Sequence, residues 1–134
     1  MKRLLLFGVF VVLMLSFTST ASAATIYGKV ENAAQYDRVI VCGIDYSYAD
    51  AFTPLISGQS ATDPRTTLSV LTFLRDHSPA CVYPQKDGSF SINFPDKQVY
   101  LVIVALSNDN HSYWFAEQVD ASVTQVITTT APSF

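Results

Sequence analysis

The feature that most constrains this fold is the stretch of residues 86–106, which reads as two neighbouring strands. Asp87-Gly88 is a turn signal, because glycine accepts a backbone with positive φ. Beyond the turn, three apolar residues alternate with polar ones, which is the period of a strand with one buried face: Phe90, Ile92 and Phe94. After Pro95, residues 99–106 form an almost unbroken apolar run, which predicts a strand buried on both faces.

The first 23 residues have the layout of a signal peptide. Lys2-Arg3 is followed by an apolar core over residues 4–17, and Ala21-Ser22-Ala23 fits the small-x-small cleavage rule. A membrane anchor is the alternative, but the apolar run is shorter than the roughly 20 residues that span a bilayer. We therefore expect residues 1–23 to be removed and residues 24–134 to form one secreted or periplasmic domain, with no stable membrane span after cleavage.

Charge and cysteine content narrow the class of protein further. Without Lys2 and Arg3, the eight basic residues fall to six against 11 acidic ones, a net charge of −5. The basic residues are scattered, so the chain lacks the basic stripe that a nucleic-acid partner requires. Cys42 and Cys81 both follow the cleavage site, and an even count in an exported protein predicts a disulfide between them. Two buried free thiols are the alternative.

Further strand signals extend along the domain and make it mainly β. Ile26, Gly28 and Val30 share one strand face and Tyr27 lies on the other, while the glycine predicts a bulge or a close backbone approach. The remaining strands are expected at residues 38–46, 80–83, 113–119 and 123–129. Six or seven short strands separated by turns are typical of a sandwich or barrel rather than of an α/β fold.

Residues 63–78 carry the best helix signal of the chain. Asp63 is a good N-cap, Pro64 suits the first helical position, and Ser78-Pro79 ends the segment. Leu68, Leu71, Phe73 and Leu74 fall near one stripe of this helix. A strand is the competing interpretation, because Thr66-Thr67 and Val70 favour β structure. The end signals favour the helix. Pro54 and Gly58, by contrast, are expected to act as breakers.

Four short patterns resemble the carboxypeptidase regulatory-like, transthyretin-like domains. They are Ile26-x-Gly-x-Val30, Val39-x-Val41, Asp87-Gly-x-Phe-x-Ile92 and Tyr100-x-Val-x-Val104. The resemblance implies a single Greek-key β-sandwich, immunoglobulin- or transthyretin-like, that acts as a structural or binding module. It transfers no site residues. The chain departs from that family over residues 46–83, which carry the expected helix as an insertion between strands.

Neither catalysis nor metal binding is favoured by the polar residues. Asp76-His77-Ser78 is adjacent only in sequence, and no Gly-x-Ser-x-Gly pattern occurs, so we expect no enzyme and no catalytic residues. His77 and His111 with the two cysteines lack the close pairs of a zinc site. Residues 108–110 with Asp120 lack the spacing of a calcium loop. No cofactor or metal is therefore expected.

The aromatic residues are the most informative candidates for a binding surface. Tyr46, Tyr48 and Tyr113 flank predicted loops, and Phe52 and Trp114 are candidates with them, because such rings anchor protein interfaces or stack on sugars. Tyrosines also fit half-buried strands regardless of function. The resulting hypothesis is an exported, non-enzymatic binding or structural module for a protein or carbohydrate in the cell envelope or outside the cell. The alternative is a secreted inhibitor or effector that binds another protein through the insertion at residues 52–79.

Overall fold

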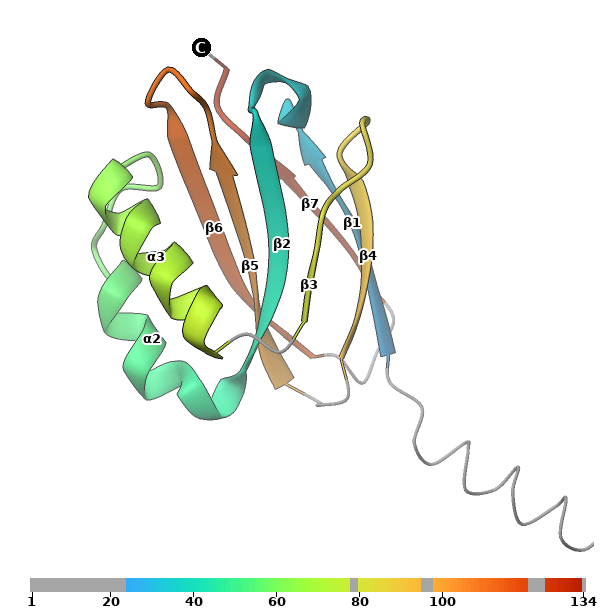
Figure 1. The fold of residues 1–134 in the computed structure, drawn as a ribbon. Helices are drawn as coiled ribbons and strands as arrows, with labels where there is room; N and C mark the ends of the chain where they lie inside the picture. The colour runs from blue at the N-terminus through green and yellow to red at the C-terminus, as the bar shows by residue number, and fades with distance from the viewer. Residues whose placement is uncertain (1–23, 78–79, 95–97, 121–124, 134) are drawn as a thin grey trace, which may run out of the picture.

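The computed structural model describes residues 24–77, 80–94, 98–120 and 125–133 (Figure 1). The predicted signal peptide lies outside these residues. The strands are β1 (Ala24–Glu31), β2 (Arg38–Asp45), β3 (Ala80–Val82), β4 (Ser89–Phe94), β5 (Gln98–Leu106), β6 (Ser112–Asp120) and β7 (Gln125–Thr130). The helices are α2 (Ala49–Ile56) and α3 (Pro64–His77), and the 3-10 turns are η1 (Ala33–Gln35) and η2 (Tyr46–Tyr48).

The strands form two sheets that face each other, so the mainly β, sandwich-like arrangement expected from the sequence is confirmed. One sheet has the order β4-β1-β7 and the other has the order β3-β2-β5-β6. Neighbouring strands run antiparallel except β1 and β7, which are parallel. Both helices lie against the outer face of the four-stranded sheet, which gives a third layer (Figure 1).

The inner core fills the space between the sheets. Ile26 and Val30 of β1 pack there with the alternate β5 residues Leu101 and Ile103, all fully buried. Gly28 lies between those two β1 residues, and a Cβ at this position would collide with the Phe90 ring and the Ile127 carbonyl oxygen. The glycine therefore permits the close approach, one of the two outcomes that its place in the strand predicts.

A second core lies between the four-stranded sheet and the helices. The other β5 residues, Val102 and Val104, pack here against Phe52 of α2 and Val70 of α3. Strand β5 is consequently buried on both faces, as its unbroken apolar sequence predicts. Residues 52–79 are thus not a separate appendage, because side chains within them complete a core of the domain.

Helix α3 confirms the prediction of a helix and corrects its buried stripe. The Asp63 carboxylate accepts hydrogen bonds from the Arg65 N–H at 3.1 Å and from the Thr66 hydroxyl at 3.0 Å, so Asp63 caps the helix as expected. The buried residues are Thr66, Thr67, Val70, Phe73 and Leu74. Leu68 was placed on this stripe but is 65% exposed, because at 100° per residue it lies on the opposite side of the helix from Val70 and Phe73.

Helix α2 was missed because Pro54 reads as a breaker. Proline inside a helix costs about 3 kcal/mol, since it removes a hydrogen bond and crowds the preceding turn. Pro54 nevertheless lies within the eight residues of α2. Phe52 is fully buried, and its ring lies 5.3 Å from that of Phe73 and 5.4 Å from that of Tyr100. Tertiary packing of this kind outweighs local propensity, and it is not visible in the sequence of the helix itself.

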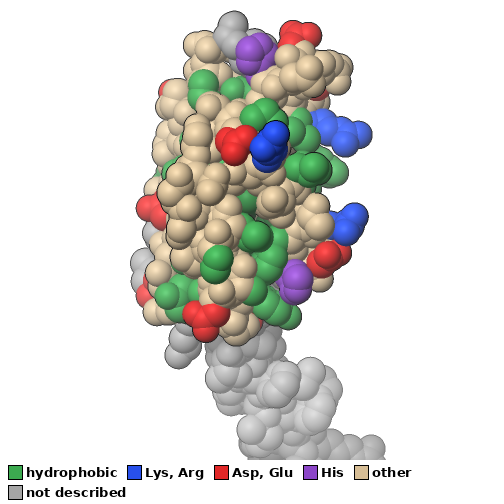
Figure 2. Space-filling model, turned by 90° about the vertical axis from the view of Figure 1, so that its left-hand side faces the viewer, with side chains coloured by type: hydrophobic (Ala, Val, Ile, Leu, Met, Phe, Trp, Pro, Cys, Tyr) green, Lys and Arg blue, Asp and Glu red, His purple; other side chains and the backbone are tan. Residues whose placement is uncertain are grey.

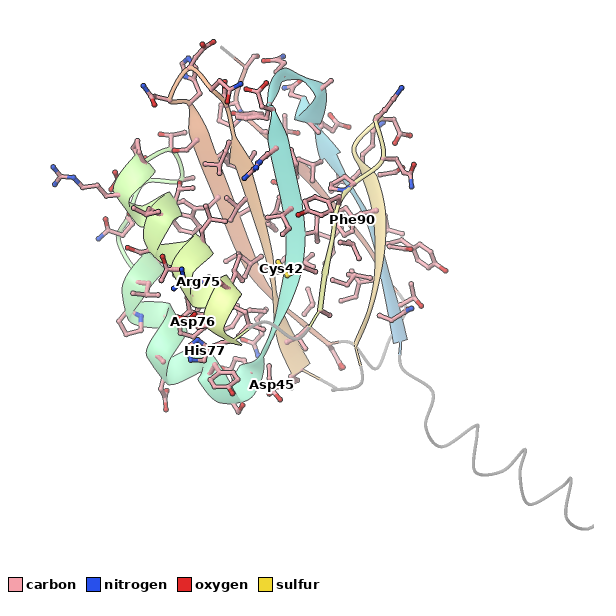
Figure 3. All side chains as sticks on the ribbon, viewed as in Figure 1. Cys42, Asp45, Arg75, Asp76, His77 and Phe90 are labelled. Carbon is pink, nitrogen blue, oxygen red and sulfur yellow. A yellow bond between two sulfur atoms is a disulfide. The ribbon has the colours of Figure 1, made fainter. Side chains whose placement is uncertain are left out.

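The expected disulfide between Cys42 and Cys81 is present (Figure 3). The two cysteines are directly opposite in the antiparallel ladder of β2 and β3, where their Cα atoms are 4.1 Å apart. The bond therefore attaches the three-residue edge strand β3, and with it the end of the helical layer, to a central strand of the sheet.

Candidate functional site

The structure separates the five aromatic residues predicted to bind a partner. Tyr46 and Tyr48 are 38% and 40% exposed on η2, and Phe52 is buried beneath them. Tyr113 is buried between the sheets, where its hydroxyl lies 2.8 Å from the Thr129 hydroxyl. Trp114 is half-buried on β6 and donates its indole N–H to the Ser60 carbonyl at 2.9 Å. Only the two η2 tyrosines therefore present large ring areas to solvent at one place.

A row of tilted rings in contact with one another begins at Tyr46. Its ring centroid lies 5.6 Å from that of Tyr100, a β5 residue. The Tyr100 ring contacts Phe52, and Phe52 contacts Phe73 of α3. These separations fall in the range of favourable aromatic pairs. The row connects the outer face of the sheet with both helices, so the Tyr46 ring packs against side chains that are themselves held by the core.

His77 joins this arrangement at the last residue of α3, beside η2 (Figure 3). Its ring stacks on Phe73 with centroids 4.3 Å apart, and it lies 5.0 Å from the Tyr48 ring. Its Nδ1 is 3.2 Å from the Phe73 carbonyl oxygen. We call the partly exposed residues Tyr46, Tyr48 and His77 the aromatic surface. The sequence offered only the end of the helix as a signal for His77, because its contact with Tyr48 joins segments 29 positions apart (77 minus 48).

An apolar groove of about 430 Å³ adjoins the aromatic surface along the helices. Leu55 of α2 and Leu68, Phe73 and His77 of α3 line it, together with the polar side chains of Ser69, Thr72 and Asp76. Figure 2 views the molecule from the helical side, where separate hydrophobic side chains interrupt a mostly polar surface. The groove gives the aromatic surface an apolar continuation.

The carboxylates near this surface have structural partners. Asp45 accepts a hydrogen bond from the Ser47 N–H at 2.9 Å and so caps η2. Asp76 forms an ion pair with Arg75 at 3.1 Å, and both side chains are largely exposed (Figure 3). The Asp76-His77-Ser78 sequence thus offers no visible relay, since His77 contacts Phe73 instead and Ser78 lies outside the described residues.

The cation-site candidates from the sequence have other partners as well. Both cysteines are in the disulfide, and no group of three His, Cys, Asp or Glu side chains is arranged to hold a metal among the described residues. The turn at residues 108–110 is bound by Asp37, which accepts the Asn108 N–H at 2.6 Å. Among the helices within the described ranges, none has the length and apolar character needed to cross a membrane.

A larger groove of about 570 Å³ lies at the opposite end of the sandwich, lined by the connections at residues 33–39 and 83–86. Tyr83 is exposed there, but its lining mixes polar and charged side chains such as Arg38 and Lys86. The smaller groove on the helices is the better candidate, because two leucines line it and its lining residue His77 contacts the partly exposed Tyr48.

No family model, curated protein or solved structure matches this chain. The resemblance to transthyretin-like domains therefore stays a prediction from short sequence patterns.

Proposed function

We propose that this protein is an exported, non-enzymatic binding module that docks a partner protein on the aromatic surface. The observation that carries the proposal is the pair of partly exposed η2 tyrosines, each packed on a neighbouring ring, with His77 joining Tyr48 to the groove on the helices. Tyrosines held in this way are typical anchors of protein interfaces.

Preorganisation supports this role for Tyr46 and Tyr48. Binding normally costs about 0.5–1.5 kcal/mol for each side chain that it immobilises. Here the Tyr48 ring already packs against His77 and Phe73, and the Tyr46 ring against Tyr100. A partner would therefore gain ring contacts without ordering the rings first.

The apolar groove favours a protein partner over a carbohydrate. Leu55 and the largely exposed Leu68 offer apolar area that a protein partner can bury, and the polar lining residues Ser69, Thr72 and Asp76 can form hydrogen bonds with it. The alternative, an inhibitor that inserts residues 52–79 into another active site, receives less support. The helices within this range lie against the face of the sheet, which favours docking of one face on another (Figure 1).

We also propose that the two sheets form a Greek-key sandwich, and the strand order supports this fold. In a Greek key, four successive strands take the spatial order 4-1-2-3. The orders β4-β1 and β2-β3 occur here in separate sheets, as in a Greek key divided between them. The disulfide supports export, because such bonds persist in oxidising compartments.

The test is capture of a partner from envelope and culture fractions by the disulfide-bonded protein. Removing a hot-spot ring typically costs 2 kcal/mol or more, so we expect Tyr48→Ala to weaken binding of the captured partner by at least about tenfold. Tyr48→Phe, which keeps the ring, should retain most of the affinity. Tyr83→Ala is the matched control, because Tyr83 is exposed at the other groove. Loss of binding in Tyr83→Ala with retention in Tyr48→Ala would place the interface elsewhere.

A further inference from the structure

We propose that the open edge of β7 pairs antiparallel with the β7 of a second copy, about a two-fold axis at Thr128. This inference concerns the sheet that the helices do not cover, so it is independent of the proposed docking surface. The pairing would join two three-stranded sheets into one continuous sheet (Figure 1).

The direction of the backbone groups in β7 follows from its pairing with β1. The Ala131 N–H donates to the Glu31 carbonyl at 3.0 Å, and the register aligns Ile127 with Gly28 and Thr129 with Val30. Because backbone groups alternate in direction along a strand, residues 127 and 129 direct theirs towards β1. The N–H and C=O groups of Val126, Thr128 and Thr130 consequently point to the outer edge, where the described part of the chain supplies no neighbouring strand.

β7 also lacks the devices that normally protect a free edge. Proteins protect edge strands with charges, prolines, bulges or covering segments. The residues Gln125–Thr130 contain no charge and no proline, and they are rich in β-branched side chains. Val126 is 74% exposed at this edge, next to the exposed Tyr27 with which it is in register.

The other edge strands contrast with β7. On β6, the Trp114 N–H donates to the Ala61 carbonyl at 2.9 Å, so the α2–α3 connection covers part of that edge. Glu117 is exposed on β6, so this edge strand also carries a charge. β3 has three residues and lies beside β4, the outer strand of the other sheet (Figure 1). β4 also has no charge and no proline, but β3 lies alongside it, so among the described residues β7 is the edge that has neither a protective residue nor a strand beside it.

The β7 sequence is complementary to itself in one register. When Thr128 faces Thr128 of the partner subunit, Val126 faces Thr130 of the partner subunit. All outward N–H and C=O groups of these residues then find partners. Buried Ile127 would face Thr129 of the partner subunit on the inner side. Every facing pair joins β-branched side chains, and no like charges meet.

Sedimentation velocity of the disulfide-bonded protein tests this proposal with charge variants at the two-fold axis. In both Thr128→Lys and Thr128→Glu, like charges would face each other, so each variant should be monomeric. An equimolar mixture of the two should form dimers again. Ser91→Lys is the matched control, because Ser91 is exposed on β4 of the same sheet, and it should stay dimeric like the unmodified protein.

A proline variant and amide hydrogen exchange test the same pairing independently of charge. Thr128→Pro removes an outward N–H that is not used in pairing with β1, so it should abolish the dimer while the thermal unfolding of the monomer is retained. The amides of Val126, Thr128 and Thr130 should exchange more slowly in the dimer than in the Lys variant. A monomeric unmodified protein would overturn self-pairing and leave the edge to a strand of another protein. A dimer that survives Thr128→Lys, or no dimer in the mixture, would overturn this register.

Discussion

Asp87 holds the turn that leads into β4. Its Oδ1 accepts hydrogen bonds from the Ser89 hydroxyl at 2.6 Å and from the Ser89 N–H at 3.0 Å. These bonds favour the carboxylate, so the Ser89 hydroxyl, followed by the Ser89 N–H, lowers the pKa of Asp87 below 3.8. Gly88 completes the turn with a φ of 88°, and a Cβ there would collide with the Val30 carbonyl oxygen. The turn signal in the sequence therefore has a specific cause at both residues.

Substitution of Ser89 should raise the pKa of Asp87. Ser89→Ala removes the hydroxyl that has the largest effect, so an NMR titration of the carboxyl group should give a pKa closer to 3.8. A folded-state pKa below the unfolded value stabilises the protein above pH 3.8, and this contribution is lost as pH falls through the folded-state pKa. The difference in unfolding free energy between the unmodified protein and Asp87→Asn should therefore shrink in acid. An unchanged Asp87 pKa in Ser89→Ala would contradict this account.

Single residues differ in how well the sequence predicts their surroundings. The alternation in β1 correctly placed Ile26 and Val30 inside and Tyr27 outside. Tyr48 and Tyr113 were not distinguishable, because a tyrosine beside a loop suits either an exposed turn or a half-buried strand. Contact between Tyr48 and His77 depends on how α3 lies on the sheet, so no local pattern could have indicated it.

At the scale of elements, the sequence predicted where α3 begins more accurately than which face of α3 is buried. Asp63 and Pro64 predicted the start of α3 because capping is a local interaction. The buried face of α3 includes Thr66 and Thr67, which are polar, and their hydroxyls bond to Asp63. A stripe chosen from leucines alone therefore missed the true contact face.

Two substitutions to alanine compare the buried and exposed sides of the helical layer. Phe52→Ala should lower the free energy of unfolding by about 3–5 kcal/mol, because it leaves a cavity in the second core. Leu68→Ala is the matched control and should change it by no more than about 0.5 kcal/mol, since Leu68 is largely exposed. Urea unfolding measures both. If both substitutions lowered the free energy of unfolding equally, the helices would not form a core with the sheet. In that case the domain would stay folded without residues 52–79, whereas the second core predicts that their removal unfolds it.

At the scale of the whole molecule, the disulfide connects parts that local patterns treat separately. The even cysteine count predicted the pairing, but it gave no position for β3 in the sheet. The structure places Cys81 opposite Cys42 on β2, directly after the helical layer. The bond thus closes the segment that contains both helices, and the last helical residue of that segment, His77, lies beside η2.

Loss of the disulfide should lower the free energy of unfolding, mainly because the unfolded chain gains conformational entropy. The cysteines are 39 positions apart, and closing a loop of about 40 residues stabilises a fold by roughly 4 kcal/mol in the chain-entropy model. Urea unfolding of the oxidised protein, the reduced protein and the Cys42→Ala/Cys81→Ala double variant measures the effect. The reduced protein and the double variant should both lose stability. Their free energy of unfolding should also fall more steeply with urea concentration, because an unfolded chain without the disulfide exposes more surface. If the reduced protein and the double variant unfolded at a lower urea concentration but with an unchanged slope, the effect would instead come from packing around the fully buried Cys42.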